Sequence, residues 1–119
     1  ENEPENVNKT RHIFFEKDYI RYFLTGTFCT DYIEAEGSML FDCNTMQWDK
    51  KLCDLAGVTA DMLPPVVKPT NIIGKVTSSA AKATGLSEGT PVICGTTDTV
   101  MEVFASGAVK KGQMTLKLA

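Results

Sequence analysis

The sequence predicts an α/β fold, and three observations lead to this prediction. Short apolar runs with β preference alternate with short helical patterns in the second half of the chain. Glycine follows several of the helical patterns, at the position where it readily ends a helix. Residues 91–94 form an apolar run typical of a buried strand, and Gly95 then permits a sharp turn into a helix that begins at Asp98.

The first part of the chain is predicted to be helical. Residues 1–8 are polar and lead into a helix, and the helix after it is expected to end near Gly26. Four aromatic residues recur in this second helix at helical spacing and are expected to form a face toward the core: Phe15, Tyr19, Tyr22 and Phe23. Thr30 is then placed to cap a short helix that Gly37 ends.

The remaining elements are separated by Gly, Pro, Asn and Asp, the residues that favour turns. A strand or extended run, a turn, an amphipathic helix, a helical turn and an extended connector are expected in this order: 38–42, 44–45, 49–56, 59–63 and 66–71. A strand, a helix, a turn, a strand, a helix, a loop and a strand follow: 72–76, 79–84, 87–90, 91–94, 98–105, 106–112 and 113–118. The two later helices are expected to be capped by Thr77 or Ser78 and by Thr96 or Thr97.

Composition narrows the class of protein. The 119 residues are 43% hydrophobic, which suffices for one core of ordinary size. The net charge is −3 and no basic patch is present, so the sequence argues against a nucleic-acid partner. The sequence contains no apolar run long enough to span a bilayer and no secretory leader, so no membrane partner is expected.

The cysteines predict neither a metal site nor a disulfide framework. The chain contains four cysteines and one histidine, and no pair of cysteines has the Cys-x-x-Cys spacing of zinc sites: Cys29, Cys43, Cys53, Cys94 and His12. We expect reduced thiols in or near the core of a cytoplasmic protein. The sequence gives no support for a disulfide.

The two ends predict that the chain is a piece of a longer protein. The sequence starts at Glu1 without an initiating Met, and it stops within the strand predicted from residue 113 onward. Exposed strand edges and apolar faces would favour self-association, so we expect a homo-oligomer.

Asp98 is the strongest candidate for chemistry. It would lie at the carboxyl end of a strand, where open α/β sheets bind ligands, and in the first helical turn, where the helix dipole keeps a carboxylate ionised. One interpretation is a charge that only complements the dipole. The other is a general base that takes a proton from a bound hydroxyl. The spacing alone does not decide between these interpretations.

Asp31 is a second candidate, in a segment that also carries Glu34 and Glu36. These carboxylates are either solvent-facing charges or, for Asp31, part of the same cleft as Asp98.

Several short motifs occur in a fixed order along nearly the whole chain: 17–22 with 24–26, 30–32 with Ala35 and Gly37, 40–42, Trp48, 63–66, 73–77, 85–86, 88–92 and 95–98. None of them is specific by itself. Their order and spacing resemble the FGGY carbohydrate kinases, particularly the xylulokinase-like members.

This resemblance implies two actin-like domains of the ribonuclease H type, with a sugar bound in the cleft between them. It implies transfer of the γ-phosphoryl group of ATP, with Mg²⁺, to a hydroxyl of a ketose or polyol such as xylulose. The catalytic base of the family is the Asp of a Gly-x-x-Asp turn, which corresponds to Asp98. Asp98 therefore becomes the expected catalytic and substrate-binding residue, and Asp31 stays a weaker candidate for substrate binding.

The chain departs from the family pattern at five positions. Thr97 stands where the family mostly has Gly, and Thr99 replaces the amide residue after the base. Ile33 and Glu34 replace the Ser and Asp of the Thr-Asp-x-Ser-Asp-Ala pattern, and Glu36 replaces a small residue. These changes leave the base in place and bear on which sugar is bound.

The resemblance also predicts which part of such a kinase this chain represents. Residues 1–107 correspond to the second half of the N-terminal, sugar-binding domain, and residues 108–119 to the start of the C-terminal, nucleotide-binding domain. Neither phosphate-binding loop of the family is present, so no residue of the fragment is expected to bind the nucleotide or a metal. The isolated fragment is therefore predicted to be inactive.

Two alternatives from other classes remain open. The first is a non-catalytic actin-like module that binds a ligand or a partner, which the unusual Thr97 and Thr99 favour. The second is a standalone α/β interaction domain, which the missing Met and the unpaired final strand disfavour.

Overall fold

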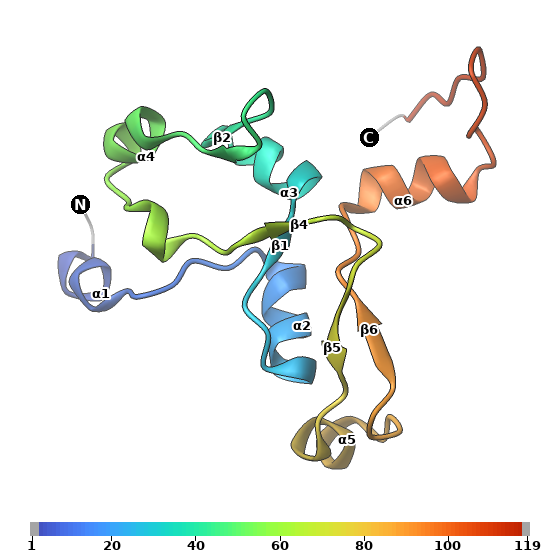
Figure 1. Ribbon diagram of the computed structural model, residues 1–119, viewed down its shortest axis with the longest axis horizontal. Coiled ribbons are helices and arrows are strands. Elements are labelled where there is room, and N and C mark those ends of the chain that lie inside the picture. The colour runs from blue at the N-terminus through green and yellow to red at the C-terminus, as the bar shows by residue number, and fades with distance from the viewer. Residues whose placement is uncertain (1–2, 118–119) are drawn as a thin grey trace.

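The computed structural model describes residues 3–117 and confirms the predicted mixture of helices and strands (Figure 1). The strands form one parallel and two antiparallel pairs: β1 (Thr30–Asp31) with β4 (Val66–Val67), β2 (Phe41–Asp42) with β3 (Gln47–Trp48), and β5 (Ile72–Lys75) with β6 (Pro91–Ile93). The helices alternate with them: α1 (Pro4–Lys9), α2 (Glu16–Thr25), α3 (Tyr32–Gly37), α4 (Lys50–Ala56), the 3₁₀ turn η1 (Ala60–Met62), α5 (Ser78–Thr84) and α6 (Asp98–Ala105).

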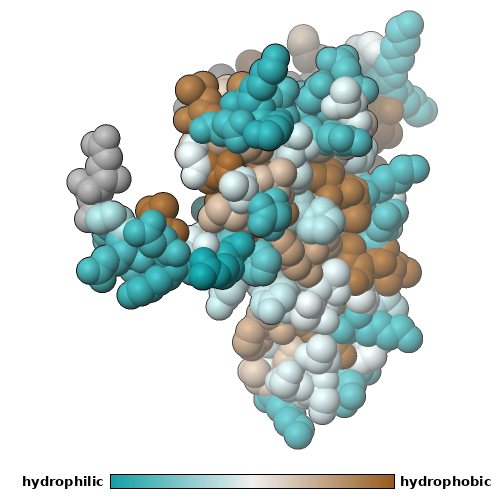
Figure 2. Space-filling model, turned by 60° about the vertical axis from the view of Figure 1, so that its left-hand side comes forward, coloured by the Kyte–Doolittle hydropathy of each residue, from teal (hydrophilic) through white to brown (hydrophobic). Residues whose placement is uncertain are grey.

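The parallel pair β1·β4 lies at the centre of the chain (Figure 1). Helix α2 and the β5·β6 pair lie on one side of it, and α3, β2 and α4 lie on the other. Helix α1 buries no residue and stands apart from the rest (Figures 1 and 2). No helix of the described residues is long and apolar enough to cross a membrane.

Helix α2 ends as predicted, because Gly26 adopts the left-handed conformation at φ 74° and donates its N–H to the carbonyl of Tyr22. The prediction of an aromatic core face is wrong for this helix. Tyr19, Tyr22 and Phe23 are 59%, 42% and 53% exposed. The buried residues of α2 are Asp18 and Arg21, one helical turn apart, whose paired charges occupy the inward face instead.

Near the β1·β4 pair, the structure differs from two predictions, one for the cap of α3 and one for residues 66–71. Thr30 does not cap α3, because it belongs to β1, and the side chain of Asp31 accepts the capping hydrogen bonds from the N–H groups of Ile33 and Glu34. Residues 66–71 are not only a connector. Val66 and Val67 pair with Thr30 and Asp31, a pairing that brings together segments far apart in sequence.

The turn, the amphipathic helix and the helical turn predicted between residues 44 and 63 are present, whereas strand β3 and a cap at Asp49 were not predicted. A turn joins β2 to β3, Asp49 caps α4, and Gly57 ends α4 in the left-handed conformation. The indole N–H of Trp48 donates to the carbonyl of Pro64 at 2.9 Å, and its ring meets Phe41 edge to face. These contacts join the hairpin to the chain that enters β4.

The predicted strands and helix between residues 72 and 94 are present, with α5 capped by Thr77 and ended by Gly85. The strand that leads to Asp98 is less buried than expected. Cys94 is 1% exposed, but Ile93 is 55% exposed, and β6 runs antiparallel to β5 rather than within a parallel sheet.

Helix α6 begins at Asp98 and is capped by Thr97, as predicted. The strand predicted at 113–118 is absent from the described part of it, residues 113–117, while residue 118 lies outside the described residues. Gln113 folds back on Lys110 through its backbone and side chain, and no neighbouring strand accompanies the segment within residues 3–117. Met114 and Leu116 are consequently 92% and 80% exposed.

The buried apolar residues of the described chain are mostly small, with Phe41 and Leu63 the larger ones: Cys29, Ala35, Phe41, Cys53, Leu63, Val76, Ala80 and Cys94. Three of the four cysteines are buried, Cys43 is exposed, and all are free thiols. The face in Figure 2 shows apolar side chains at the surface between hydrophilic ones.

Substitution of Gly74 by Ala is expected to lower the free energy of unfolding by about 1 kcal/mol. A Cβ at Gly74 would lie 3.0 Å from Cβ of Thr25 and 3.2 Å from Oγ1 of Thr27, which forces β5 away from the end of α2. Urea denaturation of the variant measures this change. Gly37→Ala is the control, because a Cβ there meets nothing within 4 Å, and an equal loss in both variants would contradict the close packing.

Candidate functional site

A cavity of about 510 Å³ lies between the first turns of helices α2, α3 and α6. Its lining is rich in charged and hydroxyl groups: Glu16, Lys17, Glu34, Thr96, Thr97 and Asp98. These residues come from three segments far apart in sequence, which the hydrogen bonds of Asp31 with Lys17 and Thr96 join. The cavity therefore depends on long-range contacts.

Asp98 is exposed at the first position of α6, where the N-terminal end of the helix favours a negative charge. Its Oδ1 accepts hydrogen bonds from the N–H and, at 3.2 Å, the hydroxyl of Thr99. These two bonds, with the nearby charge of Lys117, hold the pKa of Asp98 below its ordinary value. Asp98 is thus a carboxylate at neutral pH, open to solvent and able to accept a proton.

Asp31 lies beside the cavity but is fully buried. Its Oδ1 accepts from the hydroxyl of Thr96 at 3.0 Å as well as from the two N–H groups that it caps, and its Oδ2 accepts from Nζ of Lys17 at 2.9 Å. Both oxygens are therefore occupied by partners within the protein. Asp31 joins β1 and α3 to the turn that carries Asp98.

Lys17 is the residue whose role the sequence did not indicate. Its ammonium group lies 2.8 Å from Asp18, 2.9 Å from Asp31 and 3.4 Å from Glu34. The Asp18 and Asp31 side chains are fully buried, while that of Lys17 is 25% exposed. One ammonium thus neutralises part of the charge of three carboxylates next to the cavity.

Arg21 completes this charge cluster. It pairs with Asp18 and donates to the carbonyl oxygen and the sulfur of Cys94, and to the carbonyl of Cys29 at 3.3 Å. The (i, i+3) spacing of Asp18 and Arg21 on a predicted helix was the available signal for an ion pair, but not for its burial. Arg21 fixes the end of β6, and hence the start of the Asp98 turn, against α2.

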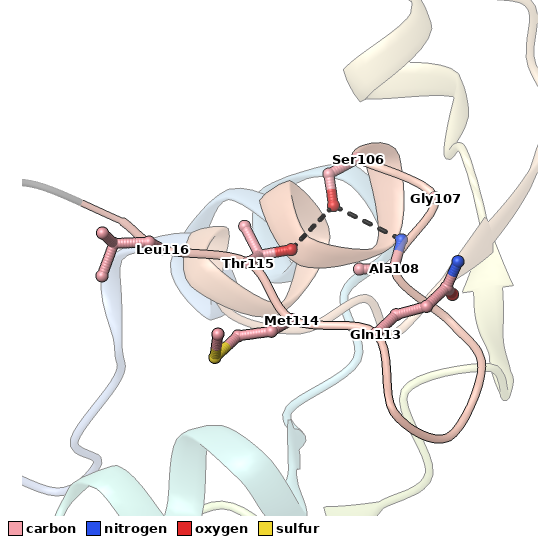
Figure 3. Close-up of a pocket in the computed structure, with 7 residues that line it drawn as sticks. All are labelled: Ser106, Gly107, Ala108, Gln113, Met114, Thr115 and Leu116. Carbon is pink, nitrogen blue, oxygen red and sulfur yellow. Dashed lines mark hydrogen bonds between the residues drawn. The ribbon is translucent and has the colours of Figure 1, made fainter.

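A second cavity, of about 530 Å³, lies in the segment after α6 and has a different character (Figure 3). Its lining contains no ionisable side chain: Ser106, Gly107, Ala108, Gln113, Met114, Thr115 and Leu116. The hydroxyl of Ser106 lies 3.1 Å from that of Thr115 and accepts from the N–H of Ala108 at 3.4 Å. Since acid–base chemistry needs a titratable group, the first cavity is the candidate active site.

Removal of the Lys17 charge in Lys17→Met is expected to lower the free energy of unfolding by about 2 kcal/mol, because two buried carboxylates lose their ammonium partner. Urea denaturation at neutral pH measures the change. Lys50→Met is the matched control. Lys50 pairs with Asp54 at 2.6 Å at the surface, where such a pair contributes little to stability, and equal effects would contradict a special role for Lys17.

Known proteins with similar sequences and structures are kinases. The chain is 33% identical over 113 residues to the xylulose kinase of Bacillus subtilis, a match that covers 95% of this chain and 23% of the relative. It is 36% identical over 96 residues to the autoinducer-2 kinase of Escherichia coli, covering 81% of this chain and 18% of the relative. The chain therefore spans less than a quarter of the length of these curated relatives.

The solved structure of xylulose kinase from Rhodospirillum rubrum superposes with a TM-score of 0.87 at 29% identity, covering 92% of this chain and 22% of that structure. The fold is thus a part of the actin-like, ribonuclease H-like fold of these kinases, as predicted. Residues 1–105 match the profile of the FGGY family of carbohydrate kinases, N-terminal domain. The chain belongs to the FGGY family of carbohydrate kinases.

Proposed function

We propose that this chain is part of an ATP-dependent kinase that phosphorylates a hydroxyl of a ketose or polyol such as xylulose, with Asp98 as the general base. The observation that carries the proposal is the exposed, ionised carboxylate of Asp98 in the lining of a polar cavity. The names of the relatives, xylulose kinase and autoinducer-2 kinase, support the class of reaction.

The proposed role of Asp98 is to bind the acceptor hydroxyl and take its proton as the oxygen attacks phosphorus. Both hydrogen bonds from Thr99 reach Oδ1, which leaves Oδ2 without a protein partner among residues 3–117. Oδ2 is thus the atom that we assign to the substrate hydroxyl. The hydroxyl of Thr96 donates to Asp31, whereas that of Thr97 accepts from the N–H of Val100 and keeps its own proton for a further hydrogen bond.

A direct contact of Asp31 with the sugar is the weaker part of the proposal, because both of its carboxylate oxygens are occupied. Its contacts favour a positioning role, in which Asp31 holds Thr96 and hence the turn before Asp98. Glu34 and Lys17 lie in the cavity lining and are better placed than Asp31 for polar contacts with a sugar.

We assign ATP and Mg²⁺ to other parts of the longer protein. Within residues 3–117, no group of three or more His, Cys, Asp or Glu side chains is arranged to hold a metal ion, and the chain has no glycine-rich phosphate loop. The residues present therefore do not fit the nucleotide. We propose residues 1–107 as part of the N-terminal domain and 108–119 as the start of the next, and the end of the family match at residue 105 supports this boundary.

The second candidate function is a non-catalytic ligand-binding or interaction module of the same family. It is favoured by one observation, the presence of Thr97 and Thr99 where kinases of this family mostly have Gly and an amide. The Thr99 hydroxyl bonds to the proposed base itself. The following experiment separates the two candidates.

In the full-length protein, Asp98→Asn is expected to lower kcat by about 10²- to 10⁴-fold with ATP and xylulose or another accepted ketose, because the amide cannot take a proton. Sugar binding is expected to change little, since the amide keeps the shape of the carboxylate. An ATP-coupled assay gives kcat, and calorimetry gives the affinity for the sugar.

The control is Asp42→Asn, because Asp42 also accepts from the N–H two residues on and from the hydroxyl of Thr45, and these bonds likewise lower its pKa. Asp42 lies on β2, outside the cavity lining. An Asp98→Asn variant as active as Asp42→Asn would overturn the assignment of the base and favour the module.

The isolated chain of residues 1–119 is expected to show no turnover with ATP and a ketose, because it has no loop to position the triphosphate. A coupled assay tests this expectation, and turnover by the purified chain would contradict it.

The isolated chain is also expected to self-associate through exposed apolar side chains such as Phe23 and Phe104, which are 53% and 66% exposed. Light scattering measures the association, and a monodisperse monomer at high concentration would contradict the expectation.

A further inference from the structure

Cys29 and Cys94 form a pair of neighbouring thiols that the proposed mechanism does not use. Cys29 directly precedes β1 and is 5% exposed, and Cys94 directly follows β6 and is 1% exposed. Although 64 residues of chain lie between the two cysteines, one guanidinium, that of Arg21, contacts the sulfur of Cys94 and the carbonyl oxygen of Cys29. The pair is thus held together by tertiary structure.

Arg21 gives this pair an electropositive environment. Its guanidinium donates to the sulfur and the carbonyl oxygen of Cys94 and to the carbonyl oxygen of Cys29. The hydrogen bond from Cys29 lowers the pKa of Cys94, with Arg21 acting in the same direction, and the same bond raises the pKa of Cys29. A cationic partner and a thiol donor are the features that stabilise a reactive thiolate.

The other two cysteines lack these features. Cys43 is exposed, and desolvation together with the nearby Glu36 raises its pKa. Cys53 is buried, and burial together with the charge of Asp49 raises its pKa. Two carboxylates lie near the pair. Asp18 is bonded to Arg21, and the negative charge of Asp31 acts to raise the pKa of Cys94. Within residues 3–117, Cys94 is the cysteine whose sulfur accepts from a cation.

We propose that Cys29 and Cys94 are a redox modification site, which a peroxide converts into a disulfide between the start of β1 and the end of β6. The Cys94 thiolate attacks one oxygen of hydrogen peroxide, so that an S–O bond forms, the O–O bond breaks and hydroxide leaves. The Cys29 sulfur then attacks the Cys94 sulfur. The S–S bond forms, the S–O bond breaks, and the Cys29 proton leaves with the oxygen as water. Overall, two thiols and one peroxide give one disulfide and two waters.

Both cysteines are buried, so the proposal requires a local opening of the structure that admits the oxidant. Ile93, next to Cys94, is 55% exposed, and β6 is a strand of three residues paired only with β5. Hydrogen peroxide is close to water in size, and local opening at the end of such a short strand admits it.

The disulfide would act on the candidate active site. Cys94 lies four residues before Asp98 and Cys29 lies two residues before Asp31, so the cross-link joins the two segments that carry these carboxylates. It also removes the thiolate that the guanidinium of Arg21 contacts. This effect on turnover rests on the proposed function, whereas formation of the disulfide does not.

The test is peptide mapping of the full-length protein after treatment with hydrogen peroxide under native conditions, followed by alkylation of the remaining thiols. The expected result is a peptide pair linked through Cys29 and Cys94, which dithiothreitol separates again. Cys43→Ala is expected to leave the linked pair unchanged, and Cys29→Ala is expected to abolish it and to leave Cys94 as a sulfenic acid that a dimedone probe labels. Free thiols at both positions in the wild type, with oxidation at Cys43 instead, would overturn the proposal.

Turnover measured on the same samples separates this proposal from the proposed function. A loss of kinase activity that follows the linked peptide and returns with dithiothreitol supports the action on the site. Absence of any turnover before oxidation would count against the kinase assignment, while the peptide map would still decide whether the disulfide forms.

Discussion

The ammonium group of Lys17 is the contact on which the arrangement of this chain depends. Two carboxylates, Asp18 and Asp31, are buried, and burial of a charge costs several kcal/mol unless a counter-ion and hydrogen bonds offset it. Lys17 contacts both, and Arg21 supplies a second cation to Asp18. Since Asp31 also caps α3 and accepts from Thr96, the same charges tie three segments together. The polar face of α2 must therefore point inward.

The local features of the fold could be predicted from the sequence, and the long-range ones could not. Glycines at helix ends and Thr at helix starts act on their immediate neighbours, so Gly26 and Gly57, and Thr97 as one of two candidate caps, were assigned from sequence alone. The orientation of α2 was inverted, because periodicity locates an apolar stripe but does not show that an ion cluster takes the buried side. Strands of two residues, such as β4, have no periodicity to detect.

In the candidate site, too, the local feature could be predicted from the sequence and the long-range contacts could not. Asp98 follows a strand and a glycine turn, a local pattern that its position at the start of α6 confirms, although its catalytic role stays a proposal. Lys17 and Thr96 both bond to Asp31, across 14 and 65 positions of sequence. No spacing rule connects residues at such separations. The sequence therefore pointed to the two carboxylates, Asp98 and Asp31, and gave no sign of the contacts of Lys17 and Thr96 that join their segments.

The position of Trp48 determines what the tryptophan fluorescence of this protein reports. It is the only tryptophan of the chain, and its indole is bonded to Pro64 and packed against Phe41 of β2, a strand that lies on the side of β1·β4 away from the β5·β6 pair (Figure 1). Its fluorescence therefore reports the environment of the hairpin and of the chain entering β4. A rearrangement confined to the start of α6 leaves that signal unchanged, so within this chain the intrinsic emission separates loss of the hairpin from events at the carboxylate of Asp98.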